Sequence, residues 1–223
     1  YLNYVGFEPN ERSRRDLLNK ENSRNCHTYN ILQYAVWDSK TELEFNLCAK
    51  PEVSSIYSPK FEFLKNFPQV ERFDVVSTET VSVVPMDSLD LTNPDFIKLD
   101  IQGGELNAIE GAHRLLNDAL GLELEVEFVE LYANQPLFGS VCEFLSKKGF
   151  EFIDFVNLCR WERASFNSFG QCVFGDALFL RTPEKIDYAE ISVDKLSAYF
   201  SVLLIYRRFD LIDTTLGLLP KPV

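Results

Sequence analysis

The stretch Phe96-Ile97-Lys98-Leu99-Asp100-Ile101-Gln102-Gly103-Gly104-Glu105 decides the fold. Its first half is compact and apolar, which is typical of a buried strand. Two glycines then allow a tight turn into a helix, whose apolar residues recur at helical spacing as far as Asn117. A strand, a turn and a helix in this order predict one unit of an α/β sheet with Asp100 and Gln102 at the carboxyl edge of the strand. The alternative interpretation is that these polar residues only cap and turn the chain.

Similar segments flank this unit on both sides. Strand-like stretches lie at residues 2–7, 30–36, 43–47, 70–84, 95–101, 122–128, 150–156 and 174–181, and helix-like stretches lie at 10–19, 104–117 and 141–148. Strands that alternate with helices predict an α/β fold with a doubly wound, mostly parallel, Rossmann-like sheet.

The composition indicates an ordinary globular protein. Of 223 residues, 46% are hydrophobic and 25% are charged, so one elaborated domain is expected. The formal net charge of −12 argues against binding to nucleic acid or to an anionic lipid surface. No apolar run approaches the ~20 residues of a membrane-spanning helix, so no membrane association is expected.

The cysteine pattern bears on compartment and metal binding. Five cysteines, with no CxxC pair, accompany only two histidines. This pattern favours reduced thiols in a cytoplasmic protein over a disulfide framework or a zinc site. We expect no metal ligands.

The character of the chain changes after Thr182-Pro183. We expect a main domain over residues 1–182 and a helical extension over residues 183–223, with apolar residues on one face of its first helix and a second helix at 210–218. The extension could dock on the main domain, form a homodimer surface or cover the substrate as a lid. The sequence does not separate these alternatives.

A second strand also ends in an acidic residue, in Gly6-Phe7-Glu8-Pro9-Asn10. Rossmann-like folds bind ligands at this edge, where a carboxylate can accept both hydroxyls of a ribose. The same charge would repel a 2′-phosphate. Alternatively, Glu8 only favours the positive N-terminus of the following helix.

Three carboxylates alternate along residues 122–128, at Glu123, Glu125 and Glu127. Residues two apart in a strand lie roughly 6.5 Å from each other on one face, which is anomalous for an interior parallel strand. Crowded carboxylates raise one another's pKa, which suits Glu125 or Glu127 to proton abstraction. A solvated face and a divalent-metal site are the alternatives. The loops 54–59 and 130–136 add polar groups that could line a cleft, although such loops are more often simple turns.

Taken together, these strings resemble the FkbM-type methyltransferases, a family that uses S-adenosylmethionine. The matching strings occur in order at residues 6–10, 35–38, 54–59, 96–105, 125–128, 132, 135–138, 149–150, 161–163 and 175–181. The resemblance implies methylation of a hydroxyl on a sugar, polyketide or related small metabolite.

The resemblance also implies residue roles. The cofactor would contact Glu8 at its ribose, Asn10 nearby, Ala35, Val36 and Trp37 on the adenine side, and Asp100, Ile101 and Gln102 beside the methionine portion and sulfonium. The acceptor would contact Ser54, Ser55, Glu125, Tyr132 and Gln135. Candidates for the general base are, in order, Asp100, Glu105 and Glu127.

One departure from the family pattern concerns the first strand. That strand and its glycine-rich loop should precede Tyr1 and lie between the strands that end at Glu8 and Asp100. We therefore expect a sheet without its first strand, either through truncation or because other residues fill the middle. The competing functions are an NAD-dependent Rossmann oxidoreductase and a non-catalytic relative that binds a partner through its C-terminal helices.

Overall fold

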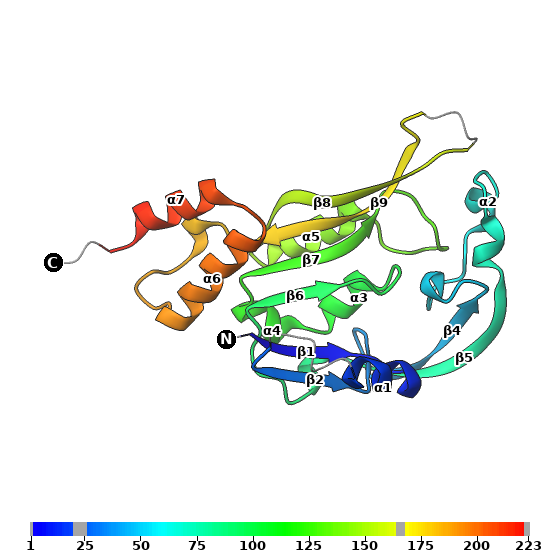
Figure 1. Ribbon diagram of the computed structural model, residues 1–223, viewed down its shortest axis with the longest axis horizontal. Coiled ribbons are helices and arrows are strands. Elements are labelled where there is room, and N and C mark those ends of the chain that lie inside the picture. The colour runs from blue at the N-terminus through cyan, green and yellow to red at the C-terminus, as the bar shows by residue number, and fades with distance from the viewer. Residues whose placement is uncertain (1, 20–25, 164–167, 221–223) are drawn as a thin grey trace.

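The computed structural model describes residues 2–19, 26–163 and 168–220, and the strands of these residues form three sheets (Figure 1). The pairing orders are β1 (Asn3–Phe7) with β2 (Thr28–Leu32); β3 (Ala35–Val36), β5 (Val75–Val84), β4 (Thr41–Cys48); and β6 (Phe96–Leu99), β7 (Gly121–Glu127), β9 (Gln171–Leu180), β8 (Glu151–Trp161). The helices are α1 (Glu11–Asn19), α2 (Phe61–Leu64), α3 (Glu105–Glu110), α4 (His113–Asp118), α5 (Phe138–Lys147), α6 (Val193–Ile205) and α7 (Phe209–Leu218).

The four-stranded sheet is mixed, which corrects the prediction of a mostly parallel, doubly wound arrangement. Strands β6 and β7 are parallel, but β9 runs antiparallel to both β7 and β8. The physical reason is that β8 and β9 pair antiparallel as in a hairpin, with Trp161 opposite Gln171. Antiparallel neighbours of this kind require no helical crossover between them. The α/β class itself is confirmed.

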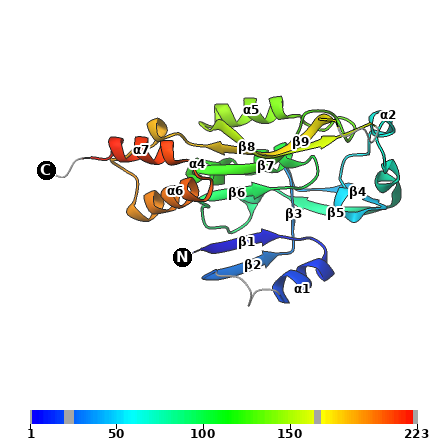
Figure 2. The ribbon, with the colours of Figure 1, turned by 45° about the horizontal axis from the view of Figure 1, so that its top comes forward.

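Strands β1 and β2 form a parallel pair of their own. Figures 1 and 2 show this pair beside β6, with the arrows of β1, β2, β6 and β7 pointing the same way. Among the described strands, none pairs with both β1 and β6. The sheet is therefore interrupted at the position where the resemblance implied a further strand, and the carboxyl ends of β1 and β6 lie at the same edge.

The main core lies between the four-stranded sheet and the helices that follow its strands. All seven residues of β7 are buried, because β7 pairs on both sides and is covered on its faces. Its apolar residues pack with residues of α3, α4 and α5, among them Leu122, Leu124, Val126, Ala108, Ile109, Leu115, Leu116, Val141 and Leu145. Burial of each such large side chain contributes roughly 1.5–3 kcal/mol.

The helix predicted over residues 104–117 is broken into α3 and α4 around Gly111. A Cβ atom at Gly111 would lie 2.0 Å from the carbonyl oxygen of Trp37, so the backbone of the segment after β3 approaches too closely for any side chain there. This long-range contact accounts for the break, which the local apolar periodicity does not reveal.

The C-terminal helices α6 and α7 are present as predicted. Tyr199, Val202 and Leu203 of α6 pack on Leu178 and Leu180 of β9, and the Tyr199 hydroxyl donates to the Arg181 carbonyl at 2.7 Å. Figure 1 shows both helices at the end of the sheet opposite to the carboxyl ends of β6 and β7. The extension is therefore docked and does not cover that edge as a lid. Within the described residues, no helix is long and apolar enough to cross a membrane.

Candidate functional site

The turn that follows β6 is held by the side chain of Glu105. Glu105 Oε1 accepts the backbone N–H of Ile101 at 2.6 Å, and Oε2 accepts the N–H of Gly103 at 3.0 Å. Gln102 and Gly103 both have left-handed backbone conformations, with φ of 59° and 96°. Because both of its oxygens bind backbone groups, the Glu105 carboxylate acts as an internal brace for the turn.

Gln102 connects this turn to two neighbouring elements. Its Nε2 donates to Glu125 Oε2 at 2.9 Å and to Asp100 Oδ1 at 3.2 Å. Its Oε1 lies 3.1 Å from the hydroxyl of Tyr132, which also lies 2.9 Å from the carbonyl oxygen of Val53. The single hydroxyl proton can serve one of these two acceptors at a time.

All three glutamates of β7 are buried, which contradicts the alternative of a solvated face: Glu123, Glu125 and Glu127 are 7%, 9% and 3% exposed. Burial, followed by the charges of Asp100 and Glu105, raises the pKa of Glu125 to about 8. Burial and the charges of Glu105 and Glu125 raise the pKa of Glu127 well above its ordinary value, whereas Gln135 opposes this shift. Burial likewise raises the pKa of Glu105 to about 7 against the opposing backbone hydrogen bonds.

The three glutamates differ in their compensation. Glu123 pairs with Lys98 and accepts a hydrogen bond from Tyr206. In the described part of the chain, no lysine, arginine or histidine forms an ion pair with Asp100, Glu105, Glu125 or Glu127. We call these four residues the carboxylate cluster. No group of three His, Cys, Asp or Glu side chains suited to a metal ion occurs among the residues described.

The loop 54–59 lies beside the loop 130–136, as the backbone pairing of Pro59 with Tyr132 shows. The Ser55 hydroxyl donates to the Gln102 carbonyl at 2.6 Å and so joins the loop to the turn. Gln135 Oε1 accepts the N–H of Tyr132 at 2.6 Å. Ser54 instead accepts the N–H of Cys48 at 3.0 Å, a local bond that does not reach the cluster.

The residues expected on the adenine side divide into two groups. Trp37 is buried against the same turn: a Cβ atom at Gly104 would lie 2.7 Å from its ring. Val36 is part of the main core, and Ala35 is half-buried in β3. Of the three, the Trp37 ring is the side chain that is placed against the turn.

Glu8 and Asn10 make local bonds at the start of α1. Glu8 Oε1 accepts the N–H of Asn10 at 2.8 Å, and Asn10 Oδ1 accepts the N–H of Ser13 at 3.0 Å. Within the described residues, neither side chain hydrogen-bonds to the carboxylate cluster. Glu8 is only partly buried and directly follows β1, whose carboxyl end lies at the same edge as that of β6 (Figure 1).

Four polar residues near the site, Tyr57, Asn107, Asp38 and Asp176, were given no role from the sequence. The Tyr57 hydroxyl donates to Asn107 Oδ1 at 2.7 Å, and Asn107 Nδ2 donates to Asp38 Oδ2 at 3.1 Å. Asp176 lies opposite Glu125 in the pairing of β7 with β9 and adds a further carboxyl group. The sequence could have indicated Asp176, because it is a lone acidic residue in an apolar strand. It could not have indicated the Tyr57–Asn107 contact, which joins residues fifty positions apart.

Comparisons with known proteins point to one family. No curated protein matches the chain significantly. A solved structure, the methyltransferase FkbM from Methylobacillus flagellatus KT, is 13% identical with a TM-score of 0.46, and the match covers 80% of this chain and 36% of that chain. The family model described as the methyltransferase FkbM domain matches residues 2–152, which is most of the chain. The chain therefore belongs to the FkbM methyltransferase family.

Proposed function

We propose that this chain transfers a methyl group from S-adenosylmethionine to a hydroxyl of a sugar or related small metabolite. The observation that carries the proposal, beyond family membership, is that the carboxylate cluster at the carboxyl edge of β6 and β7 forms no ion pair in the described part of the chain, while the pKa values of its three glutamates are raised. Buried carboxylates without a cationic partner favour a ligand that brings positive charge. S-adenosylmethionine carries such a charge on its sulfonium and supplies an electrophilic methyl group when bound.

The residues at this edge fit the cofactor in chemical type. Glu8 at the end of β1 provides a carboxylate for the ribose hydroxyls, with Asn10 next to it, and the Trp37 segment provides an apolar wall for adenine. Asp100, which is exposed, would face the positively charged methionine portion together with Ile101 and Gln102. Residues 1–182 would form the methyltransferase unit, with residues 183–223 as its helical extension.

Among the three candidates for the general base, Asp100 is favoured by its environment. Glu105 has both oxygens bound to backbone N–H groups, and Glu127 is almost fully buried. Asp100 is solvent-exposed, and its side chain accepts a hydrogen bond from Gln102 and none from a backbone N–H among the described residues. In our proposal Asp100 takes the hydroxyl proton while Ser55, Tyr132 and Gln135 shape the acceptor side.

The proposal is tested by calorimetric titration with S-adenosylhomocysteine. Glu8→Ala is expected to weaken binding by about tenfold or more, because a charge-assisted hydrogen bond contributes about 1.5–3 kcal/mol. Glu42→Ala removes an exposed carboxylate from β4 and serves as the matched control. NAD is titrated in parallel. A folded protein that binds neither ligand would favour the non-catalytic alternative, and binding of NAD alone would favour an oxidoreductase.

The role of Asp100 requires a separate measurement. Asp100→Asn keeps the size of the side chain and removes its basicity. With a panel of hydroxylated sugars as acceptors, we expect a lower kcat at saturating S-adenosylmethionine, together with weaker binding of S-adenosylhomocysteine because Asp100 also faces the methionine portion. Equal turnover by the variant and the wild type would remove Asp100 as the base without affecting the cofactor assignment.

A further inference from the structure

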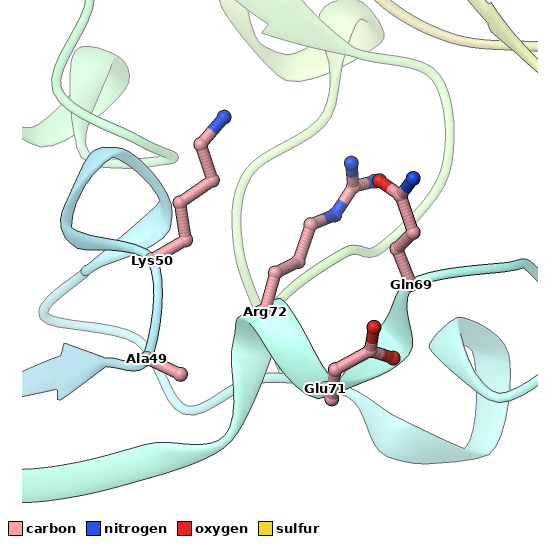
Figure 3. A pocket seen from close by; sticks show the side chains of 5 residues that line it. All are labelled: Ala49, Lys50, Gln69, Glu71 and Arg72. Carbon is pink, nitrogen blue, oxygen red and sulfur yellow. The ribbon is translucent and has the colours of Figure 1, made fainter.

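A second polar site lies outside the carboxylate cluster. A pocket of about 450 Å³ lies between the end of β4 and the 3₁₀ turn Val70–Phe73, and it is lined by Ala49, Lys50, Gln69, Glu71 and Arg72 (Figure 3). Two of its five lining residues are cations, in a chain whose formal net charge is −12. This local excess of positive charge is what calls for an explanation.

The backbone holds Lys50 and Arg72 next to each other. The N–H of Lys50 donates to the carbonyl of Arg72 at 3.0 Å, and the N–H of Ala49 donates to the carbonyl of Asp74 at 2.8 Å. Figure 3 shows the side chains of Lys50 and Arg72 projecting to the same side, whereas the Glu71 carboxylate lies lower, nearer the backbone of the turn. The adjacency of the two cations is therefore built into the pairing of their segments.

The guanidinium of Arg72 is fixed by aromatic rings. Its Cζ lies 4.5 Å from the ring centroid of Trp161 and 5.1 Å from that of Phe73. Its Nε is buried and has no hydrogen-bond partner among the described residues. Stacking of this kind orients the planar donor group but leaves its N–H groups unsatisfied.

Among the described residues, neither cation of the pocket forms an ion pair. Within the residues that the structure describes, no carboxylate oxygen lies within 4 Å of Lys50 Nζ or of the Arg72 guanidinium. The two side chains carry like charges and line the same pocket, and an anion bound there would be attracted by both. Planar arginine donors and a lysine ammonium together match the oxygens of a tetrahedral dianion.

We propose that Lys50 and Arg72 bind a phosphoryl group, with the Gln69 amide as an additional polar contact. Hydrogen bonds connect the segment that carries Lys50 to Tyr132 of the candidate active site. The Lys50 carbonyl accepts the N–H of Val53 at 3.1 Å, and the Val53 carbonyl lies 2.9 Å from the Tyr132 hydroxyl that contacts Gln102. The suggestion that the phosphoryl group belongs to the methyl acceptor rests on the proposed function. The binding of an anion by Lys50 and Arg72 does not.

The test is a calorimetric titration of the chain with inorganic phosphate at constant ionic strength. Lys50→Gln is the main variant because the side chain is exposed and the change removes only its charge. We expect phosphate to bind the wild type and to bind Lys50→Gln at least about tenfold more weakly. Lys65→Gln, at an exposed lysine just after α2, is the matched control and should leave the affinity unchanged. Arg72→Lys keeps the charge but loses the planar donors, and it should also weaken binding.

The sources of the phosphoryl group are distinguished by a second ligand. A hexose phosphate that competes with phosphate and binds more tightly identifies the group as part of the acceptor, whereas equal affinity indicates free phosphate. The proposal is overturned if the wild type does not bind phosphate, or if Lys50→Gln and Lys65→Gln bind it equally well. Because S-adenosylhomocysteine binding is measured separately, loss of the phosphate site and loss of the proposed methyl transfer give different results.

Discussion

The side-chain amide of Gln102 donates to Glu125 Oε2 over 2.9 Å, joining the turn after β6 to the interior of β7. Gln102 reaches this position because its backbone is left-handed, a conformation that few residues other than glycine adopt. The bond places a neutral donor on a carboxyl group that is otherwise surrounded by acids. Burial and the neighbouring acids nevertheless raise the pKa of Glu125 to about 8, with burial as the largest cause.

The first prediction concerns stability against pH. The pKa values of Glu105 and Glu125 are raised to about 7 and about 8, above the ordinary value of 4.5. Between these limits the folded state binds more protons than the unfolded state, so stability falls as pH rises from about 4.5 to 8. We expect a lower Tm at pH 8.5 than at pH 5.5.

Glu125→Gln isolates the contribution of one of these groups. The amide cannot ionise, so we expect the variant to be more stable than the wild type at pH 8.5, by on the order of 2 kcal/mol, and close to it at pH 5.5. Urea unfolding at both pH values measures the difference. Glu42→Gln on β4 is the exposed control. A variant with the same pH dependence as the wild type would show that Glu125 is not the titrating group.

A second prediction concerns the turn itself. Gly103 has φ of 96°, and a Cβ atom there would lie 3.2 Å from Gln135 Nε2. Gly103→Ala should therefore cost about 1–3 kcal/mol in unfolding free energy. Gly139, in α5, has nothing within 4 Å of its added Cβ. Gly139→Ala is expected to stabilise by about 0.4–1 kcal/mol, and equal effects of the two changes in urea unfolding would contradict the strained turn.

Much of the fold follows from local patterns in the sequence. The alternation in residues 122–128 predicted a strand with three carboxylates on one face, and β7 has this arrangement. The order of β8 and β9 was not predictable in the same way, because antiparallel insertion of β9 depends on pairing between distant strands. The break at Gly111 likewise depends on the carbonyl of Trp37, more than seventy positions earlier in the chain.

The candidate site shows the same division between local and long-range information. The sequence predicted Asp100 and Gln102 at the carboxyl edge of their strand and offered Glu125 as a candidate for proton abstraction, and the structure joins the three through hydrogen bonds of Gln102. The sequence did not indicate that Glu105 braces the turn, since this depends on N–H groups that the left-handed backbone turns toward its carboxylate. The sequence thus identified polar side chains that lie near the turn, but it could not predict which hydrogen-bond partners each of them takes.

A third prediction uses the charge of the cofactor. A cation near Glu125 favours the ionised carboxylate, so binding of S-adenosylmethionine should tighten as pH rises through about 8. We expect roughly a three- to tenfold gain in affinity between pH 6.5 and pH 8.5. S-adenosylhomocysteine lacks the sulfonium charge and should gain less. Equal pH dependence for the two ligands in calorimetry would place the sulfonium away from the cluster.

The last prediction concerns the docking of α6. The Tyr199 hydroxyl is fully buried and donates to the Arg181 carbonyl at 2.7 Å, at the junction between β9 and the helical extension. Tyr199→Phe should lower the unfolding free energy by about 1–2 kcal/mol, because the carbonyl loses its donor in a buried setting. Tyr34→Phe, at a residue that is 42% exposed, is the matched control and should change little. Removal of residues 183–223 should have a larger effect, since it exposes the apolar surface of Leu178 and Leu180 to water. A truncated chain that unfolds with the same free energy as the full chain would show that residues 1–182 are stable without α6 and α7.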